Sequence, residues 1–84
     1  MKEPQSADEA IAAAKADLAK RLSLDTSLVE VIAGEACTWR DASLGIPEPG
    51  KSYAQILVDG YRVLLRAAGG TFEYRFGAGI MKMC

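Results

Sequence analysis

The first quarter of the chain has apolar residues at helical spacing. From residue 7 to residue 22 they recur every three or four positions, as Ala7, Ile11, Ala14, Leu18 and Leu22. This period places them on one face of a helix, so the pattern predicts a helix over residues 7–22. Ser6 followed by Glu9 is typical of a capping box at its start. Residues 1–5 are expected to form a loose arm.

After residue 27 the pattern changes to short runs rich in β-branched and aromatic residues, which is typical of strands. Gly34 lies inside the first run and predicts a bulge or bend. Asp59-Gly60 and Gly69-Gly70 predict two tight hairpin turns. The predicted strands are residues 28–39, 53–58, 61–67 and 71–76, with a short last strand in the tail 80–84.

The two turns fix which residues share a face of the sheet. The face predicted to meet the helix carries Ala54, Ile56, Val58, Tyr61, Val63, Leu65, Ala67, Phe72, Tyr74 and Phe76. The other face carries Tyr53, Gln55, Leu57, Arg62, Leu64, Arg66, Glu73 and Arg75, with Arg66 opposite Glu73. The sequence therefore predicts a single α+β domain over residues 1–84. Its N-terminal helix packs on one face of an antiparallel sheet of four or five strands.

A stiff segment separates the first strand from the rest of the predicted sheet. Pro47 and Pro49 have a fixed φ and no backbone N–H. Ile46 and Glu48 each precede a proline, which favours an extended backbone. The segment is also the place of the single tryptophan, Trp39.

Several side chains here are too apolar for a purely solvated loop, namely Trp39, Leu44, Ile46 and Tyr53. One interpretation is that they pin the loop to the domain. The other is that a rigid, partly apolar loop is presented to a partner, because binding residues are often carried by loops. The residues leave both interpretations open.

Charge and composition narrow the classes of partner. Half of the residues are apolar, and ten basic side chains nearly balance eleven acidic ones. This balance gives no electrostatic reason to expect binding to nucleic acid or to an anionic membrane. No apolar run is long enough to cross a bilayer, and the start lacks the apolar core of a signal peptide. We expect a cytoplasmic protein as written. A secreted or periplasmic one stays open if a leader was removed.

Few residues are suited to catalysis or metal binding. There is no histidine, which removes histidine-based triads and most zinc sites. Cys37 and Cys84 lack metal-ligand spacing. They form one disulfide if the protein is exported or two free thiols if it is not, and the missing leader favours thiols. Asp41 and Glu48 are better explained by solvation or capping than by paired catalysis. We therefore predict no enzymatic activity, no metal and no cofactor.

Three functional hypotheses follow. The leading one is a non-enzymatic interaction domain that presents residues 41–51 to a protein partner, in the manner of a protease inhibitor. Its candidate binding residues are Trp39, Asp41, Leu44, Ile46, Pro47, Glu48 and Tyr53. The second is a small-molecule pocket near Trp39 and Tyr53. The third is a homodimer formed through the uncovered sheet face at Leu57, Arg62, Leu64 and Arg66, since symmetric dimers are common.

The spacing of residues 39–65 also carries a resemblance. Trp39-x-Asp41-x-Ser43-Leu44-Gly45-x-Pro47-x-Pro49-Gly50-x-x-Tyr53, followed by Gly60-Tyr61-Arg62-Val63-x-Leu65, resembles a group of small, largely uncharacterised bacterial domains. The resemblance covers roughly residues 26–76. A cysteine usually precedes the first proline in that group, but Ile46 stands here, so no loop disulfide is implied. The order of a helix and then an antiparallel sheet also resembles PepSY-type and cystatin-like domains. Some of these are linked to protease inhibition.

Overall fold

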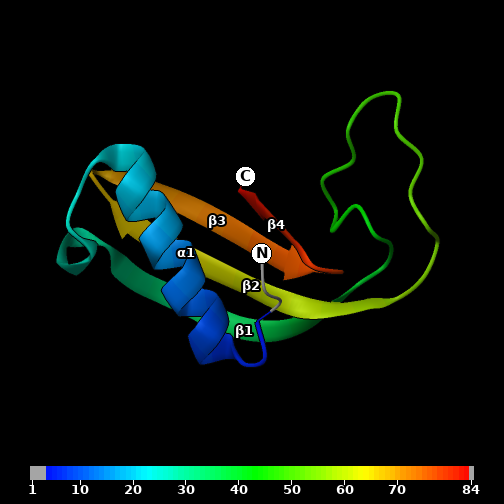
Figure 1. Ribbon diagram of the computed structural model, residues 1–84, viewed down its shortest axis with the longest axis horizontal. Coiled ribbons are helices and arrows are strands. Elements are labelled where there is room, and N and C mark those ends of the chain that lie inside the picture. Colours follow the sequence, from blue (N-terminus) through cyan, green and yellow to red (C-terminus); the bar gives the residue numbers. More distant parts are fainter. Residues whose placement is uncertain (1–3, 84) are drawn as a thin grey trace.

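The computed structural model describes residues 4–83 and has one helix on one face of a four-stranded antiparallel sheet (Figure 1). The elements are α1 (Ala7–Leu22), a 3-10 turn η1 (Thr26–Leu28), β1 (Glu30–Trp39), β2 (Val58–Ala67), β3 (Gly70–Gly77) and β4 (Ile80–Met83). The strands lie in the sheet in chain order, β1-β2-β3-β4. This arrangement confirms the predicted α+β fold and includes the short last strand.

Helix α1 begins and ends where the pattern predicts. The Ser6 hydroxyl accepts a hydrogen bond from the Glu9 N–H at 3.2 Å, and the Glu9 carboxylate accepts one from the Gln5 N–H at 3.1 Å. The helix ends at Ser23, whose backbone is left-handed with φ 55°. Of the predicted loose arm, residues 1–3 lie outside the described part of the chain, while Gln5 is tied to the helix start.

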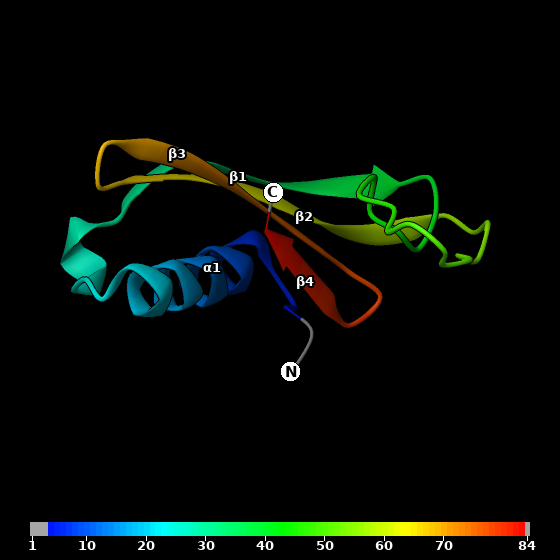
Figure 2. The same cartoon turned by 90° about the horizontal axis from the view of Figure 1, so that it is seen from above.

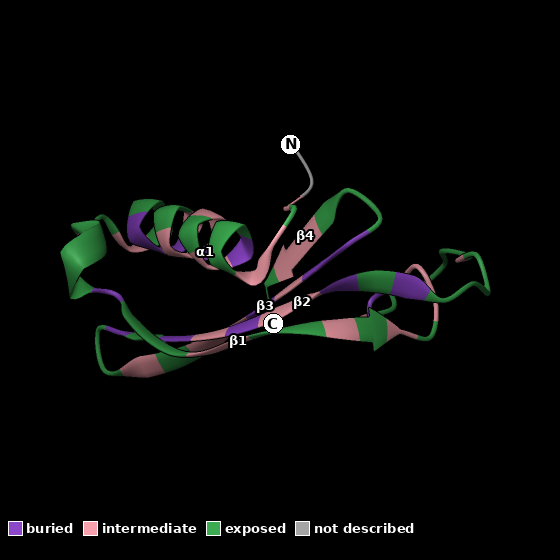
Figure 3. Ribbon diagram, turned by 90° about the horizontal axis from the view of Figure 1, so that it is seen from below, coloured by how far each residue is buried: buried purple, intermediate pink, exposed green. Residues whose placement is uncertain are grey.

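The core lies between α1 and the sheet, as Figures 2 and 3 show. Small helix residues let the sheet approach closely. The buried set comprises Ala10, Ala14, Leu18, Ala19, Val29, Val63, Leu65, Ala67, Tyr74 and Phe76. Tyr74 is fully buried, and its hydroxyl donates to the Asp17 carboxylate at 2.7 Å. Burial, and then this hydrogen bond, raise the pKa of Tyr74.

The predicted hairpin at Asp59-Gly60 is wrong. Strand β2 runs straight through both residues, and residues 53–57 form no strand. The predicted pairing of Ile56 with Val63 is therefore absent, and Val63 pairs with Gly34 of β1 instead. An Asp-Gly pair is a local turn preference, whereas the glycine at 60 is required by tertiary contacts. A Cβ there would lie 1.8 Å from the carbonyl oxygen of Phe76.

The second hairpin forms, with its turn one residue earlier than predicted. Ala68 and Gly69 both have positive φ, 50° and 76°, as the two central residues of a type I′ turn require. Leu65 consequently pairs with Phe72 and Val63 with Tyr74. A shift of the turn by one residue moves every partner by two, so the buried face stays the same. The predicted pair of Arg66 and Glu73 is lost, and Arg66 pairs with Thr71.

The bulge or bend predicted at Gly34 lies earlier in β1. The register shifts between Val31 and Ala33, while Gly34 pairs regularly. Gly34 instead leaves room for the helix, because a Cβ there would lie 2.5 Å from Cδ1 of Ile11. Residues 26–28 form η1, so β1 begins at Glu30 rather than at residue 28.

Candidate functional site

The loop of residues 40–57 joins two residues that already lie side by side. Trp39 at the end of β1 pairs directly with Val58 at the start of β2. A two-residue turn suffices between antiparallel neighbours, and irregular connections of more than about 15 residues are uncommon and are usually either functional or disordered. Figures 1 and 2 show the loop at the end of the sheet farthest from η1. This loop is therefore the candidate site.

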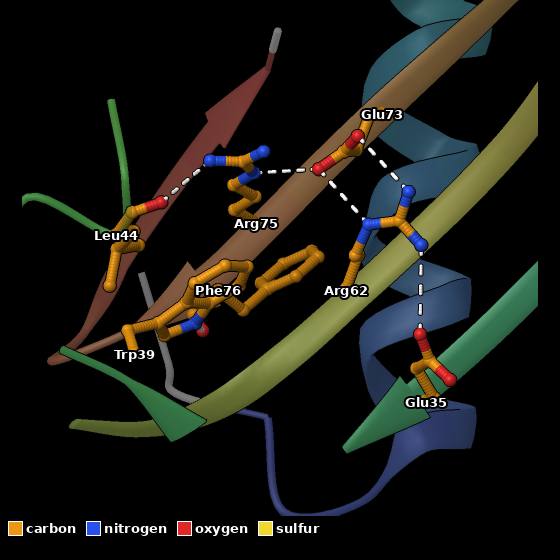
Figure 4. Close-up of polar contacts among 7 residues, drawn as sticks. All are labelled: Glu35, Trp39, Leu44, Arg62, Glu73, Arg75 and Phe76. Carbon is orange, nitrogen blue, oxygen red and sulfur yellow. Dashed lines mark hydrogen bonds and ion pairs between the residues drawn. The ribbon is translucent and has the colours of Figure 1, made fainter. Parts of the chain in front are cut away.

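The loop rests on the sheet face opposite α1, above two glycines. Gly60 and Gly77 are paired across β2 and β3, and neither has a side chain to fill that face. Trp39 lies over this gap and donates its indole N–H to the Phe76 carbonyl at 2.9 Å (Figure 4). A Cβ at Gly77 would lie 3.2 Å from the Trp39 ring. The tryptophan thus packs against the sheet.

Leu44 fills the rest of this gap. Its side chain is fully buried, and a Cβ at Gly77 would come within 2.8 Å of it and 2.9 Å of Val58. The Leu44 backbone has φ 56°, a conformation that costs roughly 1–2 kcal/mol for a residue other than glycine. Such strain persists only where surrounding contacts impose it. The structure therefore places Leu44 inside the domain, as an anchor of the loop.

Two cations bind the loop backbone from β3 and β4. Arg75 donates to the Leu44 carbonyl at 3.0 Å and lies 5.2 Å from the centre of the Trp39 ring (Figure 4). Lys82 donates to the carbonyls of Ser43 and Ile46, at 3.1 and 2.9 Å. Its ammonium group also lies 5.1 Å from the Tyr53 ring centre. These contacts fix one side of the loop to the sheet.

Side chains within the loop fix its other turns. The Asp41 carboxylate accepts hydrogen bonds from the Ser43 hydroxyl and, at 2.9 Å, from the Ser43 N–H. These bonds lower the pKa of Asp41. The Tyr53 hydroxyl accepts a hydrogen bond from the Glu48 N–H at 3.0 Å. Asp41 and Tyr53 therefore brace the loop.

A chain of ion pairs extends from the loop across the same face (Figure 4). Glu73 contacts Arg75 at 2.6 Å and Arg62 at 3.2 Å, and Arg62 reaches Glu35 at 3.6 Å. Burial raises the pKa of Glu73, but the hydrogen bonds from Arg75 and Arg62 outweigh it, so the pKa is lowered. Glu73 thus holds Arg75 in the position from which it binds the loop.

We expect Glu73→Gln to lower the free energy of unfolding by about 1.5–3 kcal/mol at neutral pH, as for other hydrogen bonds to charged groups. A carboxylate with a lowered folded pKa stabilises above its unfolded pKa of about 4.3, and this stability is lost as pH falls through the folded value. The difference in unfolding free energy between wild type and Glu73→Gln should therefore decrease toward zero as the pH is lowered. Urea unfolding at a series of pH values from 7 to 3 measures this difference. Glu30→Gln is the control, because Glu30 is exposed and its ion pair with Arg66 is long, at 3.8 Å. A pH-independent gap would contradict the expectation.

We expect Lys82→Met to loosen the loop while leaving the sheet intact, because two backbone carbonyls lose their donor. Hydrogen exchange at the Ile46 and Glu48 amides should become several-fold faster, because local opening then costs less. Exchange in β2 should change little. Lys51→Met is the matched control, since Lys51 makes only a surface ion pair with Glu48. Equal exchange in both variants would show that Lys82 does not hold the loop.

The outer rim of the loop is Ile46–Pro49, and it faces solvent. Pro47, Glu48 and Pro49 are exposed, and Ile46 is half-buried. The structure therefore divides the candidate binding residues into two groups. Trp39, Asp41, Leu44 and Tyr53 anchor the loop, whereas Ile46, Pro47 and Glu48 form the rim.

Trp39 and Tyr53, the predicted pocket residues, contact different groups. Trp39 covers the two glycines, and Tyr53 packs beneath Lys82. A groove of about 480 Å³ lies elsewhere, lined by Pro4, Gln5, Ala36, Cys37, Thr38, Asp59, Gly60 and Tyr61. Sequence reasoning missed this groove because it assigned Asp59-Gly60 to a turn. Burial raises the pKa of Cys37. The alternative of a disulfide involves Cys84, which lies outside the described residues.

The proposed dimer face is only partly a face of the sheet. Arg62, Leu64 and Arg66 alternate with the core residues of β2 and lie opposite α1. Leu57 does not belong with them, because residues 53–57 form no strand. It lies at the end of the loop with 75% of its surface exposed. Arg62 is paired with Glu73, and Leu64 is half-buried.

Residues 4–83 show neither a metal-binding cluster nor a membrane-spanning helix. No group of three or more histidine, cysteine or acidic residues in this part of the chain is placed to hold a metal ion. Within the same residues, α1 is not long and apolar enough to span a bilayer.

Comparison with curated proteins and with solved structures gives no match. A family model described as a domain of unknown function, DUF8738, matches residues 11–84. This range includes most of α1, the whole sheet and the docked loop. The chain therefore belongs to the DUF8738 family of domains of unknown function.

Proposed function

We propose that this domain is a non-enzymatic interaction module whose loop rim, Ile46–Pro49, binds a protein partner. The observation that carries the proposal is the combination of a long loop between paired strand ends with a fixed backbone. A much shorter connection would be enough to join β1 and β2, because Trp39 and Val58 are already paired. Bracing from Lys82 and Tyr53 lowers the ordering cost of binding, which favours recognition by the rim.

The division of the loop into anchors and rim supports this choice over the other hypotheses. The anchor side chains are engaged either with the sheet or within the loop, whereas Pro47, Glu48 and Pro49 are exposed. The half-buried Ile46 adds apolar surface beside them. The resemblance to PepSY-type and cystatin-like domains inferred from the sequence would suit an inhibitor-like use, although architecture alone assigns no function.

The test is affinity capture from cells that express the protein, with three baits. Wild type and Thr71→Asp should capture the same partner, because Thr71 is exposed on β3 and away from the loop. Pro47→Asp should lose it, because it places a charge on the rim while leaving the anchors unchanged. Circular dichroism confirms that all three baits are folded. Equal capture by all three would discard the proposal.

A further inference from the structure

The backbone of the loop rim offers a partner no hydrogen-bond donor. Pro47 and Pro49 have no N–H. The Ile46 N–H donates to the Ser43 carbonyl at 3.0 Å, and the Glu48 N–H donates to the Tyr53 hydroxyl at 3.0 Å. Every donor of the rim is therefore either absent or already used inside the loop.

Two acceptors of the rim remain available. The Ile46 carbonyl accepts from Lys82, and the Glu48 carbonyl accepts from the Lys51 N–H at 3.2 Å. Between and beyond them, the carbonyls of Pro47 and Pro49 accept no hydrogen bond from any residue in the range 4–83. They stand two residues apart on the exposed part of the rim. A partner must therefore bring the donors.

This arrangement disfavours two classes of partner. A partner that adds a strand needs alternating donors and acceptors along the edge that it meets. An anionic ligand needs N–H groups or free cations, but the nearby ammonium groups are engaged. Lys51 pairs with Glu48 at 2.5 Å, and Lys82 binds the loop carbonyls. The rim thus favours neither a strand edge nor a phosphate group.

The mode of recognition that remains is the binding of a polyproline II segment. Proline fixes φ at about −65° and favours an extended residue before it, so the sequence Ile46–Pro49 favours the polyproline II conformation up to the turn in which the Lys51 N–H donates to the Glu48 carbonyl. Grooves lined by aromatic side chains bind such segments. Tryptophan and tyrosine suit them because each combines an apolar ring with an N–H or O–H donor.

We propose that the partner binds the rim through an aromatic-lined groove. Its rings pack on Pro47 and Pro49, and an indole N–H or phenol O–H donates to a proline carbonyl. This inference rests on the proposed function and names the chemistry of the partner. It also favours such a groove over a protease cleft that pairs with its ligand as a strand.

The test titrates the isotope-labelled full chain with indole and follows chemical shifts by NMR. We expect shifts concentrated on Ile46–Pro49 and several-fold larger than those around Pro4, the proline outside the loop. N-methylindole has the same ring without the N–H donor, so its shifts should be clearly smaller. Shifts centred on Tyr53 or spread over the molecule would overturn the inference. So would an equal response to both probes, since the donor would then have no role.

A matched pair of variants makes the assignment specific. Pro47→Ala combined with Pro49→Ala releases φ and restores two N–H groups, so the response to indole should be lost. Pro4→Ala should keep it. An unchanged response in the double variant would overturn the inference. The titration contains no partner protein, so its failure leaves loop-dependent capture standing. Failure of capture by wild type would count against the proposed function alone.

Discussion

Gly60→Ala should lower the free energy of unfolding by about 3 kcal/mol or more, at the upper end of overpacking effects. The new methyl group would lie 1.8 Å from the Phe76 carbonyl oxygen and 2.8 Å from the indole nitrogen of Trp39. A backbone oxygen cannot rotate away as a side chain can, so β2 and β3 must separate at this point. Trp39 would then lose its hydrogen bond to the same carbonyl. Small domains have only about 5–15 kcal/mol of stability, so the loss is a large fraction of it.

Urea unfolding followed by circular dichroism measures this effect, with Gly70→Ala as the control. Gly70 is also a strand glycine, but a Cβ there would have its nearest neighbour at 3.4 Å, which is ordinary contact. Its variant should differ from wild type by no more than about 0.5 kcal/mol. Unfolding midpoints that coincide for the two variants would show that the close packing at Gly60 does not exist.

Leu44→Ala should lower the free energy of unfolding by about 2–4 kcal/mol, as expected for truncating a fully buried leucine. The cavity would open between Gly77, Val58 and the Trp39 ring. The backbone of Leu44 is left-handed, and the contacts of its side chain impose this strained conformation. Without the side chain, the loop should leave it more easily. The variant should therefore lose the fixed rim as well as stability.

Leu57→Ala is the matched control, since it removes the same atoms from the same loop. Leu57 has 75% of its surface exposed, so its truncation should change stability by no more than about 0.5 kcal/mol. Denaturant midpoints of the two variants measure the effect on stability. Hydrogen exchange at the Glu48 amide measures the effect on the order of the rim. If Leu57→Ala proved as costly as Leu44→Ala, the loop would not dock through Leu44.

Features that depend on residues close together in the sequence could be predicted, whereas features that depend on contacts between distant residues could not. Ser6 and Glu9 are three residues apart, and the apolar stripe of α1 repeats within a turn, so both can be recognised locally. The buried alternation of Val63 and Leu65 also survived a wrong turn position, because the shift moved each partner by an even number of residues. By contrast, Asp59-Gly60 has the local form of a turn, and only its contact with Phe76 shows its actual role.

The loop illustrates the same division within one segment. Its stiffness could be inferred from Pro47 and Pro49, because proline restricts its own backbone and that of its neighbour. Its cations could not, because Arg75 and Lys82 are far from it in sequence and reach it only through the sheet. The sequence leaves pinning and presentation both open; in the structure Leu44 is pinned in the domain, whereas Pro47 and Glu48 are exposed.

By itself, the sequence determined the helix over residues 7–22, the class of the fold and the presence of a stiff proline segment, because these depend on short-range periodicity and backbone restriction. Only the tertiary structure decided that Gly60 lies within a strand, that Leu44 is buried and that Ile46–Pro49 forms the exposed rim. The physical reason is that close packing joins residues remote in the chain, and no local preference encodes which of them will meet.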